Sequence, residues 1–283
     1  MPKKPARLEG AERLNATMLE ITMATCTDRG QRSANEDALR IGQAQATRYA
    51  VLSDGAGGHE RGAEASRRVV EHIEAALIAS AAAFAPAPLT QALLSAHAEL
   101  QAQQISASGP RRMHATVVVL WLDALHDRAV WSHIGDSRLY RLRYGAVDAV
   151  TTDDSVVQRM FDSGLLTPQQ AKAHPMKNQL LAAVGMQDNV EPHTLAEAVP
   201  LEDGDAYLLC TDGWWGELDA AEMAQTLNAA DTPAQWLAAM QALITTRAAA
   251  TQDNFSAIAV WVRDPSESTL SMDDDDATLL APL

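Results

Sequence analysis

The stretch ATVVVLWLDALHDRAVWSHIGDSRLYRLRYGAVDAV, residues 115–150, decides the fold. Its apolar run Val117-Val118-Val119-Leu120-Trp121 predicts a strand that is buried on both faces. Residues 129–134 and 139–143 predict two more strands. Tight turns are expected at Gly135-Asp136 and Tyr144-Gly145. This part of the chain is therefore predicted to be a run of consecutive strands.

Helices and further strands are predicted on both sides of this run. Alanine-, leucine-, glutamate- and glutamine-rich composition is typical of helices, and short apolar runs bounded by turn residues are typical of strands. The further strands are expected at residues 21–27, 49–53, 206–211 and 255–262, and the helices at residues 60–79, 89–107, 153–170, 220–228 and 233–249. Because strands come in runs and helices in runs, the order predicts an α+β fold of antiparallel sheets with helices packed outside.

The composition is that of a globular protein without disulfides. The chain has 283 residues, 47% hydrophobic and 21% charged, and a net charge of −15 from 22 basic and 37 acidic residues. This charge argues against general nucleic-acid binding, which needs clustered Lys and Arg. Only Cys26 and Cys210 are present, no apolar leader is visible at the start, and the apolar residues 75–87 are too short to cross a membrane. We expect a cytoplasmic monomer that binds neither nucleic acid nor membranes.

The two ends of the chain differ from its body. Residues 1–18 predict a flexible arm with a weak positive bias. Residues 264–283 carry six acidic and no basic side chains, so they predict a disordered acidic tail. Residues 19–263 remain as the single folded domain.

Four acidic sites lie at the edges of predicted strands. They are Asn35-Glu36-Asp37, Ser53-Asp54-Gly55, Thr211-Asp212-Gly213 and Asp253-Asn254. Converging carboxylates repel one another, so at neutral pH they need a cation, and ligands that are all oxygen suit Mg²⁺ or Mn²⁺. Each Asp-Gly could equally be an ordinary turn. The residues alone leave both interpretations open.

Arg32 stands four residues before Glu36 and five before Asp37. A guanidinium beside an anionic metal site is useful if it binds an anionic substrate, because its fork matches two phosphate oxygens. The alternative is a surface arginine that pairs with a neighbouring carboxylate.

Five motifs occur in a fixed order along the chain. They are Arg32-Ser33-Ala34-Asn35-Glu36-Asp37, Asp54-Gly55-Ala56-Gly57-Gly58-His59, Gly135-Asp136-Ser137-Arg138, Asp212-Gly213 and Asp253-Asn254. In this order they resemble the PPM family, the protein phosphatase 2C-like metal-dependent Ser/Thr phosphatases, in its bacterial form. The resemblance runs from about Thr25 to Val262. Each motif is weak by itself, but the five together are highly specific.

The resemblance implies a four-layer α-β-β-α sandwich, with a binuclear Mn²⁺ or Mg²⁺ centre at one edge of two stacked antiparallel sheets. It also implies roles for seven positions. Asp54 would be the ligand shared by both ions, and Gly55 would contribute its carbonyl. Asp212 and Asp253 would bind the first ion, Glu36 and Asp37 the second, and Asp136 a third, weaker ion. Arg32 matches the phosphate-binding arginine, and together with Asp54 it is the predicted catalytic residue. The implied reaction is hydrolysis of phosphoserine and phosphothreonine by a metal-activated water.

The chain departs from the family pattern in three places. Ala56 stands where animal relatives carry a histidine thought to protonate the leaving group, so that acid is unassigned. His114-Ala115-Thr116 replaces the usual Gly-Thr-Thr. The stretch Asp153-Asp154-Ser155 has Asp154 where the family usually has the histidine of Asp-His-Ser. None of these changes removes a metal ligand. Residues 155–185 correspond to the family's flap beside the active site, which is expected to be mobile.

Three functions fit these features. The leading hypothesis is an active phosphoprotein phosphatase that opposes a bacterial Ser/Thr kinase. A catalytically weak PPM-fold module with a regulatory or binding role is the alternative, although such proteins usually lose a metal ligand and this chain keeps all of them. A metal-dependent nuclease is disfavoured by the net charge of −15.

Overall fold

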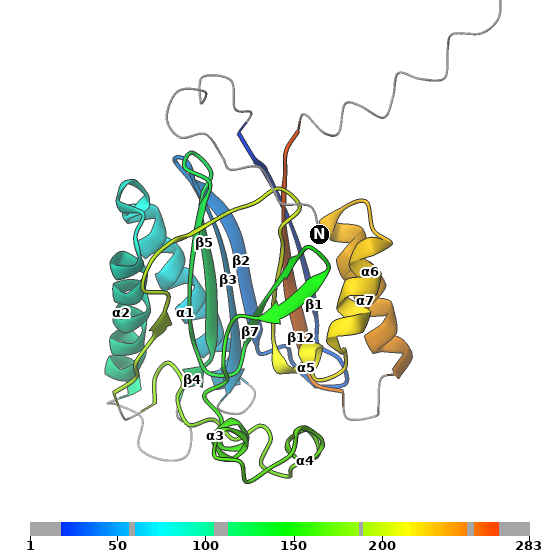
Figure 1. The fold of residues 1–283 in the computed structure, drawn as a ribbon. Helices are drawn as coiled ribbons and strands as arrows, with labels where there is room; N and C mark the ends of the chain where they lie inside the picture. Colours follow the sequence, from blue (N-terminus) through cyan, green and yellow to red (C-terminus); the bar gives the residue numbers. More distant parts are fainter. Residues whose placement is uncertain (1–17, 57–59, 105–112, 187–188, 248–251, 266–283) are drawn as a thin grey trace, which may run out of the picture.

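Two sheets lie face to face between two layers of helices (Figure 1). The computed structural model describes residues 18–56, 60–104, 113–186, 189–247 and 252–265. Helices α1 (Glu60–Ala79) and α2 (Pro86–Gln104) cover one outer face, and α6 (Ala220–Asn228) and α7 (Pro233–Arg247) cover the other. The four-layer α+β sandwich that the sequence predicts is therefore confirmed.

The sheet beneath α1 and α2 has its strands in the order β10-β6-β5-β3-β2, with β4 beside β3 and β9 beside β6. The strands of this sheet are β2 (Asp37–Ala44), β3 (Thr47–Ala56), β4 (His114–Ala115), β5 (Val117–Asp123), β6 (Arg128–Ile134), β9 (His193–Thr194) and β10 (Val199–Pro200). Every residue of β5 is buried, as the apolar run predicts. A short 3₁₀ turn, η2 (Ala81–Ala83), lies between α1 and α2.

The second sheet has the order β1-β12-β11-β7-β8, and all its pairings are antiparallel. Its strands are β1 (Glu20–Asp28), β7 (Arg138–Arg143), β8 (Ala146–Ala149), β11 (Ala206–Cys210) and β12 (Phe255–Arg263). A single helical turn, α5 (Asp212–Trp215), follows β11.

Three apolar clusters join the four layers. Leu52 and Leu120 of one sheet pack with Ile258 of the other in the centre of the sandwich. Each helical layer adds one cluster against its sheet, one around Trp121 of β5 beneath α1 and α2 and one around Trp236 of α7. Burial of apolar surface at three interfaces fixes the two sheets against each other. Loops at the ends of the strands therefore lie on a rigid frame.

One predicted helix is wrong. Residues 153–170 form two short helices, α3 (Val156–Asp162) and α4 (Pro168–Lys172), instead of one. Gly164 lies between them with φ of +73°, a left-handed conformation that ends a helix. Thr167 then caps α4 through a capping box, with a proline directly after it. Strand β2 was not predicted, because its residues alternate poorly and none of them is fully buried.

Several predictions concern residues outside the described ranges. Nearly all of the predicted arm and acidic tail, and His59 in the second motif, belong to this group. Within the described ranges, no helix combines the length and the apolar character needed to cross a bilayer.

Candidate metal centre

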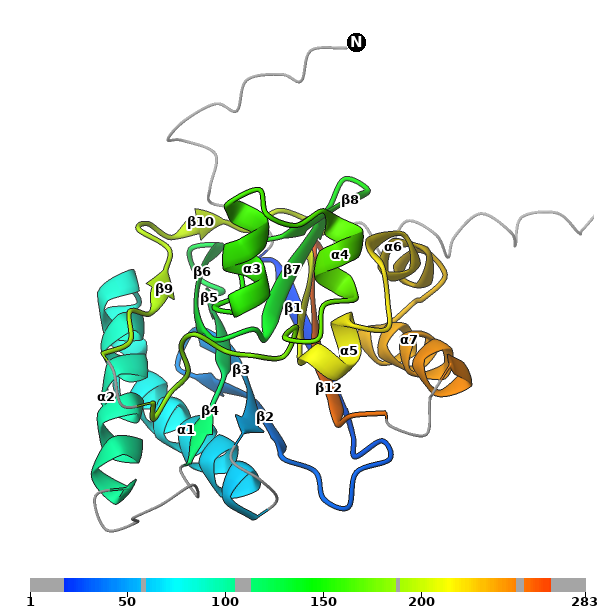
Figure 2. The same ribbon diagram turned by 90° about the horizontal axis from the view of Figure 1, so that it is seen from below.

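The predicted acidic sites meet at one end of the sandwich. Figure 2 looks onto this end, where β2 and β3 approach α5 and the start of β12. A pocket of about 460 Å³ lies there. Six of the seven predicted metal-site residues line it: Glu36, Asp54, Gly55, Asp136, Asp212 and Asp253. The seventh, Asp37, is directly opposite Asp54 on the neighbouring strand, and its Oδ1 atom is buried.

Hydrogen bonds fix the two aspartates of the β2–β3 pair. The backbone N–H of Asp54 donates to Thr116 Oγ1 at 3.1 Å, and the Thr116 N–H donates to the Asp54 carbonyl at 2.8 Å. The Thr211 hydroxyl donates to Asp37 Oδ2 at 3.2 Å from the other sheet. Asp54 lies inside β3 rather than after its end, where the sequence placed it.

Hydrogen bonds to its backbone carbonyl fix Glu36, and two glycines, Gly55 and Gly62, pack closely against it. Its carbonyl accepts hydrogen bonds from the Gly55 N–H at 3.1 Å and the Ser66 hydroxyl at 2.5 Å. A Cβ on Gly62, in the first turn of α1, would lie 2.0 Å from Glu36 Oε2. A Cβ on Gly55 would lie 2.1 Å from the Gly62 carbonyl oxygen. Both glycines are therefore needed for β3, α1 and the Glu36 carboxylate to come this close.

Asn254 holds the loop that carries Arg32. Its side-chain amide donates to the carbonyls of Arg29 at 2.8 Å and Ala34 at 2.9 Å, and its Oδ1 accepts from the Glu36 N–H at 2.8 Å. The Arg32 guanidinium donates to Asp253 Oδ2 at 2.6 Å, and 57% of its side chain is exposed. An exposed ion pair of this kind is worth little. Arg32 can therefore turn from Asp253 to an incoming anion at small cost.

Burial and mutual repulsion raise the pKa values of the clustered carboxyls. Burial, the repulsion from Asp212 and the weaker repulsion from Asp253 raise the pKa of Asp37 to about 7, against the hydrogen bonds that the carboxylate accepts. Burial and the charge of Asp253 raise the pKa of Asp212 to about 6. For Asp54 and Asp136 the same causes raise the pKa well above its usual range. The cluster therefore carries more negative charge than it can hold without a cation.

The donor set fits a hard divalent cation. Asp37 Oδ1 is buried and has no hydrogen-bond partner among the described residues, which is costly for a carboxylate unless a cation binds it. All the converging groups are oxygens, the ligands that Mg²⁺ and Mn²⁺ prefer. These oxygens are spaced more widely than those of a closed site. In the described part of the chain, three potential ligand atoms come within 4.8 Å of one another only at His133, Asp154 and His193.

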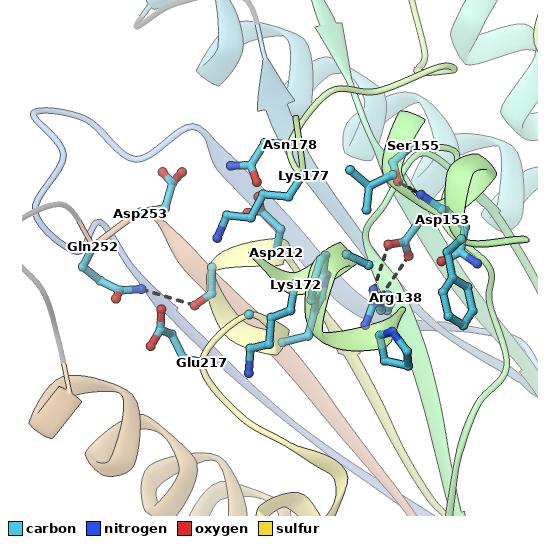
Figure 3. A pocket seen from close by; sticks show the side chains of 18 of the residues that line it. Arg138, Asp153, Ser155, Lys172, Lys177, Asn178, Asp212, Glu217, Gln252 and Asp253 are labelled. Carbon is cyan, nitrogen blue, oxygen red and sulfur yellow. Dashed lines mark hydrogen bonds and ion pairs between the residues drawn. The ribbon is translucent and has the colours of Figure 1, made fainter. Parts of the chain in front are cut away.

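A second pocket, of about 590 Å³, shares four lining residues with the first: Arg32, Asn178, Asp212 and Asp253. Residues of the predicted flap line this pocket, and Figure 3 shows Lys177 and Asn178 close to Asp212 and Asp253. The flap therefore lies beside the acidic site, as predicted.

Two side chains of the Gly-Asp-Ser-Arg motif line different pockets: Asp136 the acidic pocket and Arg138 the second pocket. Asp136 is buried, lines the acidic pocket and accepts a hydrogen bond from Trp215 Nε1 at its carbonyl oxygen, at 3.0 Å. Arg138 forms two hydrogen bonds of 2.8 Å with Asp153, and its guanidinium lies 3.5 Å above the Trp215 ring. Both tryptophan contacts pack α5 against the site.

Sequence reasoning missed the residues that position the ligands. Ser66 and Gly62 carried no signal, because each contacts Glu36 from a distant position in the chain. Thr116 and Thr211 belong to motifs that the sequence singles out, but their partners Asp54 and Asp37 lie far away in the chain, so their positioning roles could not be predicted. Asn254 is part of the predicted Asp253-Asn254 site, but its contacts with Arg29, Ala34 and Glu36 depend on the fold. An Asn side chain can accept and donate at once and so can join two loops.

Comparison with known proteins agrees with this geometry. The family model for protein phosphatase 2C matches residues 27–256. Protein phosphatase PhpP of Streptococcus pneumoniae is 31% identical over 212 residues, which cover 72% of this chain and 82% of that protein. The serine/threonine protein phosphatase PstP of Mycobacterium tuberculosis is 34% identical over 197 residues, which cover 69% of this chain but 36% of PstP.

Among solved structures, the catalytic domain of PstP in complex with two manganese ions superposes with a TM-score of 0.76. The two sequences are 27% identical, and the superposition covers 88% of this chain and 100% of the PstP domain. The fold, the acidic site and the family match agree. The chain belongs to the protein phosphatase 2C (PPM) family of metal-dependent serine/threonine protein phosphatases.

Proposed function

We propose that this phosphatase hydrolyses phosphoserine and phosphothreonine in proteins with two Mn²⁺ or Mg²⁺ ions held at the acidic pocket. Asp54 is the ligand shared by both ions, and the Gly55 carbonyl is a further ligand. Asp212 and Asp253 hold the first ion, and Glu36 and Asp37 the second, directly or through water. The orphaned Asp37 Oδ1 and the manganese-bound PstP structure support this assignment. Asp136 is the ligand of a third, weaker ion.

Bound ions of this kind acidify water and neutralise charge on a phosphoryl group. The protein's own groups supply the rest. Arg32 leaves Asp253 and binds two phosphate oxygens with its fork. Thr211 and Thr116 hold the aspartates in place before substrate arrives. The pocket beside the flap, with Lys172 and Lys177 on its wall, receives the peptide around the phosphorylated residue.

The biological setting is part of the same proposal. The substrates are phosphoproteins produced by a Ser/Thr kinase, which this enzyme opposes. Residues 19–263 are the catalytic unit, and the family match at 27–256 lies inside these limits. The free cysteines Cys26 and Cys210 suit a reducing compartment, in keeping with action in the cytoplasm.

The observation that carries this proposal is the convergence of six metal-site residues and Arg32 on one pocket. The experiment is hydrolysis of phosphoserine and phosphothreonine peptides by wild type, Asp54→Asn and Asp148→Asn, with Mn²⁺ and with EDTA. Asp54→Asn keeps the size of the side chain but removes a charge that the ions require. Asp148 is a matched control, since it lies exposed on β8 and pairs with Arg141.

We expect manganese-dependent hydrolysis in wild type and in Asp148→Asn, and a loss of at least about 100-fold in Asp54→Asn, because even residues that only orient ligands cost 10- to 100-fold. Full activity of Asp54→Asn at limiting Mn²⁺ would contradict the ligand assignment. A folded wild type that binds Mn²⁺ but leaves both peptides intact would instead support the regulatory module.

A further inference from the structure

Two histidines and an aspartate form a second cluster of potential metal ligands, away from the acidic pocket. His133 on β6 is directly opposite His193 on β9, and Asp154 precedes α3. One ring nitrogen of each histidine and one oxygen of Asp154 lie within 4.8 Å of one another. None of the three lines the pocket that holds the predicted ligands of the binuclear centre.

His133 has an unprotonated ring nitrogen, Nδ1, that could bind a metal ion. Its ring is buried, with 4% of the residue exposed. Nε2 lies 2.8 Å from the Thr152 carbonyl oxygen, which can only accept, so Nε2 carries the proton. Nδ1 is buried, and no group in the described part of the chain forms a hydrogen bond with it. Burial lowers the pKa of His133, which keeps the ring neutral. Histidines that bind metals commonly donate their other ring N–H to a carbonyl in this way.

Asp154 and His193 complete the cluster. His193 Nε2 lies 2.8 Å from Asp154 Oδ1, and the two histidine rings stack with centroids 4.9 Å apart. Asp154 Oδ2 accepts a hydrogen bond from the Gly135 N–H at 2.9 Å, which fixes the carboxylate. The His193 side chain is 49% exposed, so solvent can reach the cluster and this ring can move. A closed tetrahedral site needs ligand atoms about 3.3 Å apart for bonds of about 2.0 Å, so a modest closure is enough.

We propose that His133, Asp154 and His193 bind a borderline divalent cation of the Zn²⁺ class, separately from the binuclear centre. Two imidazoles and one carboxylate are a ligand set typical of Zn²⁺, with water in the remaining position. Mg²⁺ and Mn²⁺, which prefer oxygen, favour the acidic pocket instead. The two sites therefore differ in the chemistry that they select.

The position of this site gives the bound ion a role. Asp154 lies at the base of the flap, where its carbonyl accepts from the Leu181 N–H at 2.7 Å and Ser155 bridges to Leu180. His193 follows the flap in the chain, and His133 belongs to the sheet. A cation held by all three joins the sheet, the first flap residues and the strand after the flap. It therefore stabilises the base of the flap without touching the phosphate site.

The test compares wild type with His193→Ala and Asp154→Asn, all loaded with excess Mn²⁺ and then dialysed against Zn²⁺ at a low, fixed concentration. His126→Ala is the matched control, because His126 also pairs with an aspartate, Asp123 at 2.6 Å, and belongs to no trio of ligands in the described residues. The bound zinc per chain is measured, and Co²⁺ replaces Zn²⁺ in parallel for visible absorption. Any zinc that enters the carboxylate centre contributes equally to all four proteins.

We expect wild type and His126→Ala to retain one zinc per chain more than His193→Ala and Asp154→Asn. Only the first two should show the visible Co²⁺ bands of a site with imidazole ligands. Zinc at about 100 times its Kd should also raise their unfolding midpoint by about 5 °C more than that of His193→Ala. Equal zinc content in all four folded proteins would overturn the proposal, as would a zinc loss of the same size in His126→Ala.

Discussion

At the scale of single residues, the site consists of polar and charged groups whose burial or repulsion is unfavourable when no ligand is bound. Asp37 has a buried oxygen with no hydrogen-bond partner within the described ranges, and the pKa values of Asp54 and Asp136 lie well above their usual range because of burial and repulsion. The Arg32 guanidinium pairs with Asp253, and more than half of the Arg32 side chain is exposed. Each of these costs would be offset by one event, the arrival of divalent cations and a phosphate.

Arg32→Ala should mainly raise KM, by about 10-fold or more, with a smaller loss in kcat. The Arg32 fork would contact phosphate in the ground state and in the transition state alike, so its removal costs mostly uniform binding. Steady-state kinetics on a phosphothreonine peptide measure the split. Arg32→Lys should recover only part of the loss, because an ammonium cannot form the bidentate contact. An unchanged KM in Arg32→Ala would show that the pair with Asp253 is its only role.

Asp136→Ala should keep the two principal ions and lower turnover. Asp136 is buried beside Asp212, and its charge contributes to the raised pKa of Asp54, so it faces the centre. Calorimetric titration with Mn²⁺ checks the first part, and kcat at saturating Mn²⁺ checks the second. Loss of a high-affinity ion in the variant would place Asp136 among the principal ligands instead.

At the scale of helices and strands, the sequence predicts well what local chemistry determines. Helices α1 and α6 have the predicted limits, and β5 is the buried strand expected from its apolar run. The helix predicted at 153–170 is wrong, because Gly164 and the Thr167 capping box outweigh the helical composition around them. Strand β2 has no local signal, since its pairing with β3 is what makes it a strand.

The candidate site also combines features that the local sequence predicts with features that depend on the fold. The acidic residues that converge on the pocket can be predicted, because their motifs have a fixed order that resembles a known family. Their positioning cannot, because it depends on contacts across the fold. Thr211 holds Asp37 although 174 positions separate them, and Asn254 holds the Glu36 backbone across 218 positions. The His133, Asp154 and His193 cluster was missed for this reason also, since β9 brings its third member in.

Gly62→Ala tests how α1 is fitted to the site. In an ordinary helix this change stabilises by up to about 1 kcal/mol. Here the new Cβ would lie 2.0 Å from Glu36 Oε2, so the carboxylate must move. We expect Mn²⁺ affinity to fall by about 10-fold or more, while the free energy of unfolding of the metal-free protein changes by less than about 1 kcal/mol.

The double variant Gly62→Ala with Glu36→Ala provides the control. If the alanine acts by displacing Glu36, it should add little to the loss in Mn²⁺ affinity that Glu36→Ala causes by itself. Additive losses would mean that Gly62 acts through another contact, such as its close approach to Gly55.

At the scale of the whole molecule, the acidic pocket lies where the two sheets meet. Asp37 and Asp54 belong to the sheet under α1, whereas Asp212 and Asp253 lie beside β11 and β12 of the other sheet. Repulsion among them pushes the two sheets apart at this end, and the shared core holds them together. A cation bound between them would replace that repulsion with attraction, so metal binding should stabilise the whole sandwich.

This coupling predicts a pH dependence with a definite sign. The folded pKa values of Asp37 and Asp212, about 7 and about 6, lie above the value of 3.8 for a free side chain. Between about pH 4 and 7 the metal-free folded protein therefore holds protons at these groups that the unfolded chain has lost, and their contribution to stability falls as pH rises. Buried His97 and His133 act in the opposite direction, because their pKa values are lowered. The aspartate contribution must therefore be isolated with a variant.

In EDTA, the unfolding midpoint of Asp37→Asn should rise relative to that of wild type as pH increases from about 5 to about 8, because asparagine has no proton to lose. Saturating Mn²⁺ should raise the wild-type midpoint more at pH 8 than at pH 5, because the ions bind only the ionised carboxylates. Asp37→Asn should gain less from Mn²⁺ at pH 8, since it lacks one of the charges. Thermal unfolding followed by circular dichroism at four pH values, with EDTA and with Mn²⁺, measures all three effects. A constant difference between the two proteins in EDTA across this range would show that Asp37 is already ionised in the metal-free fold, and a manganese effect independent of pH would show the same for the whole cluster.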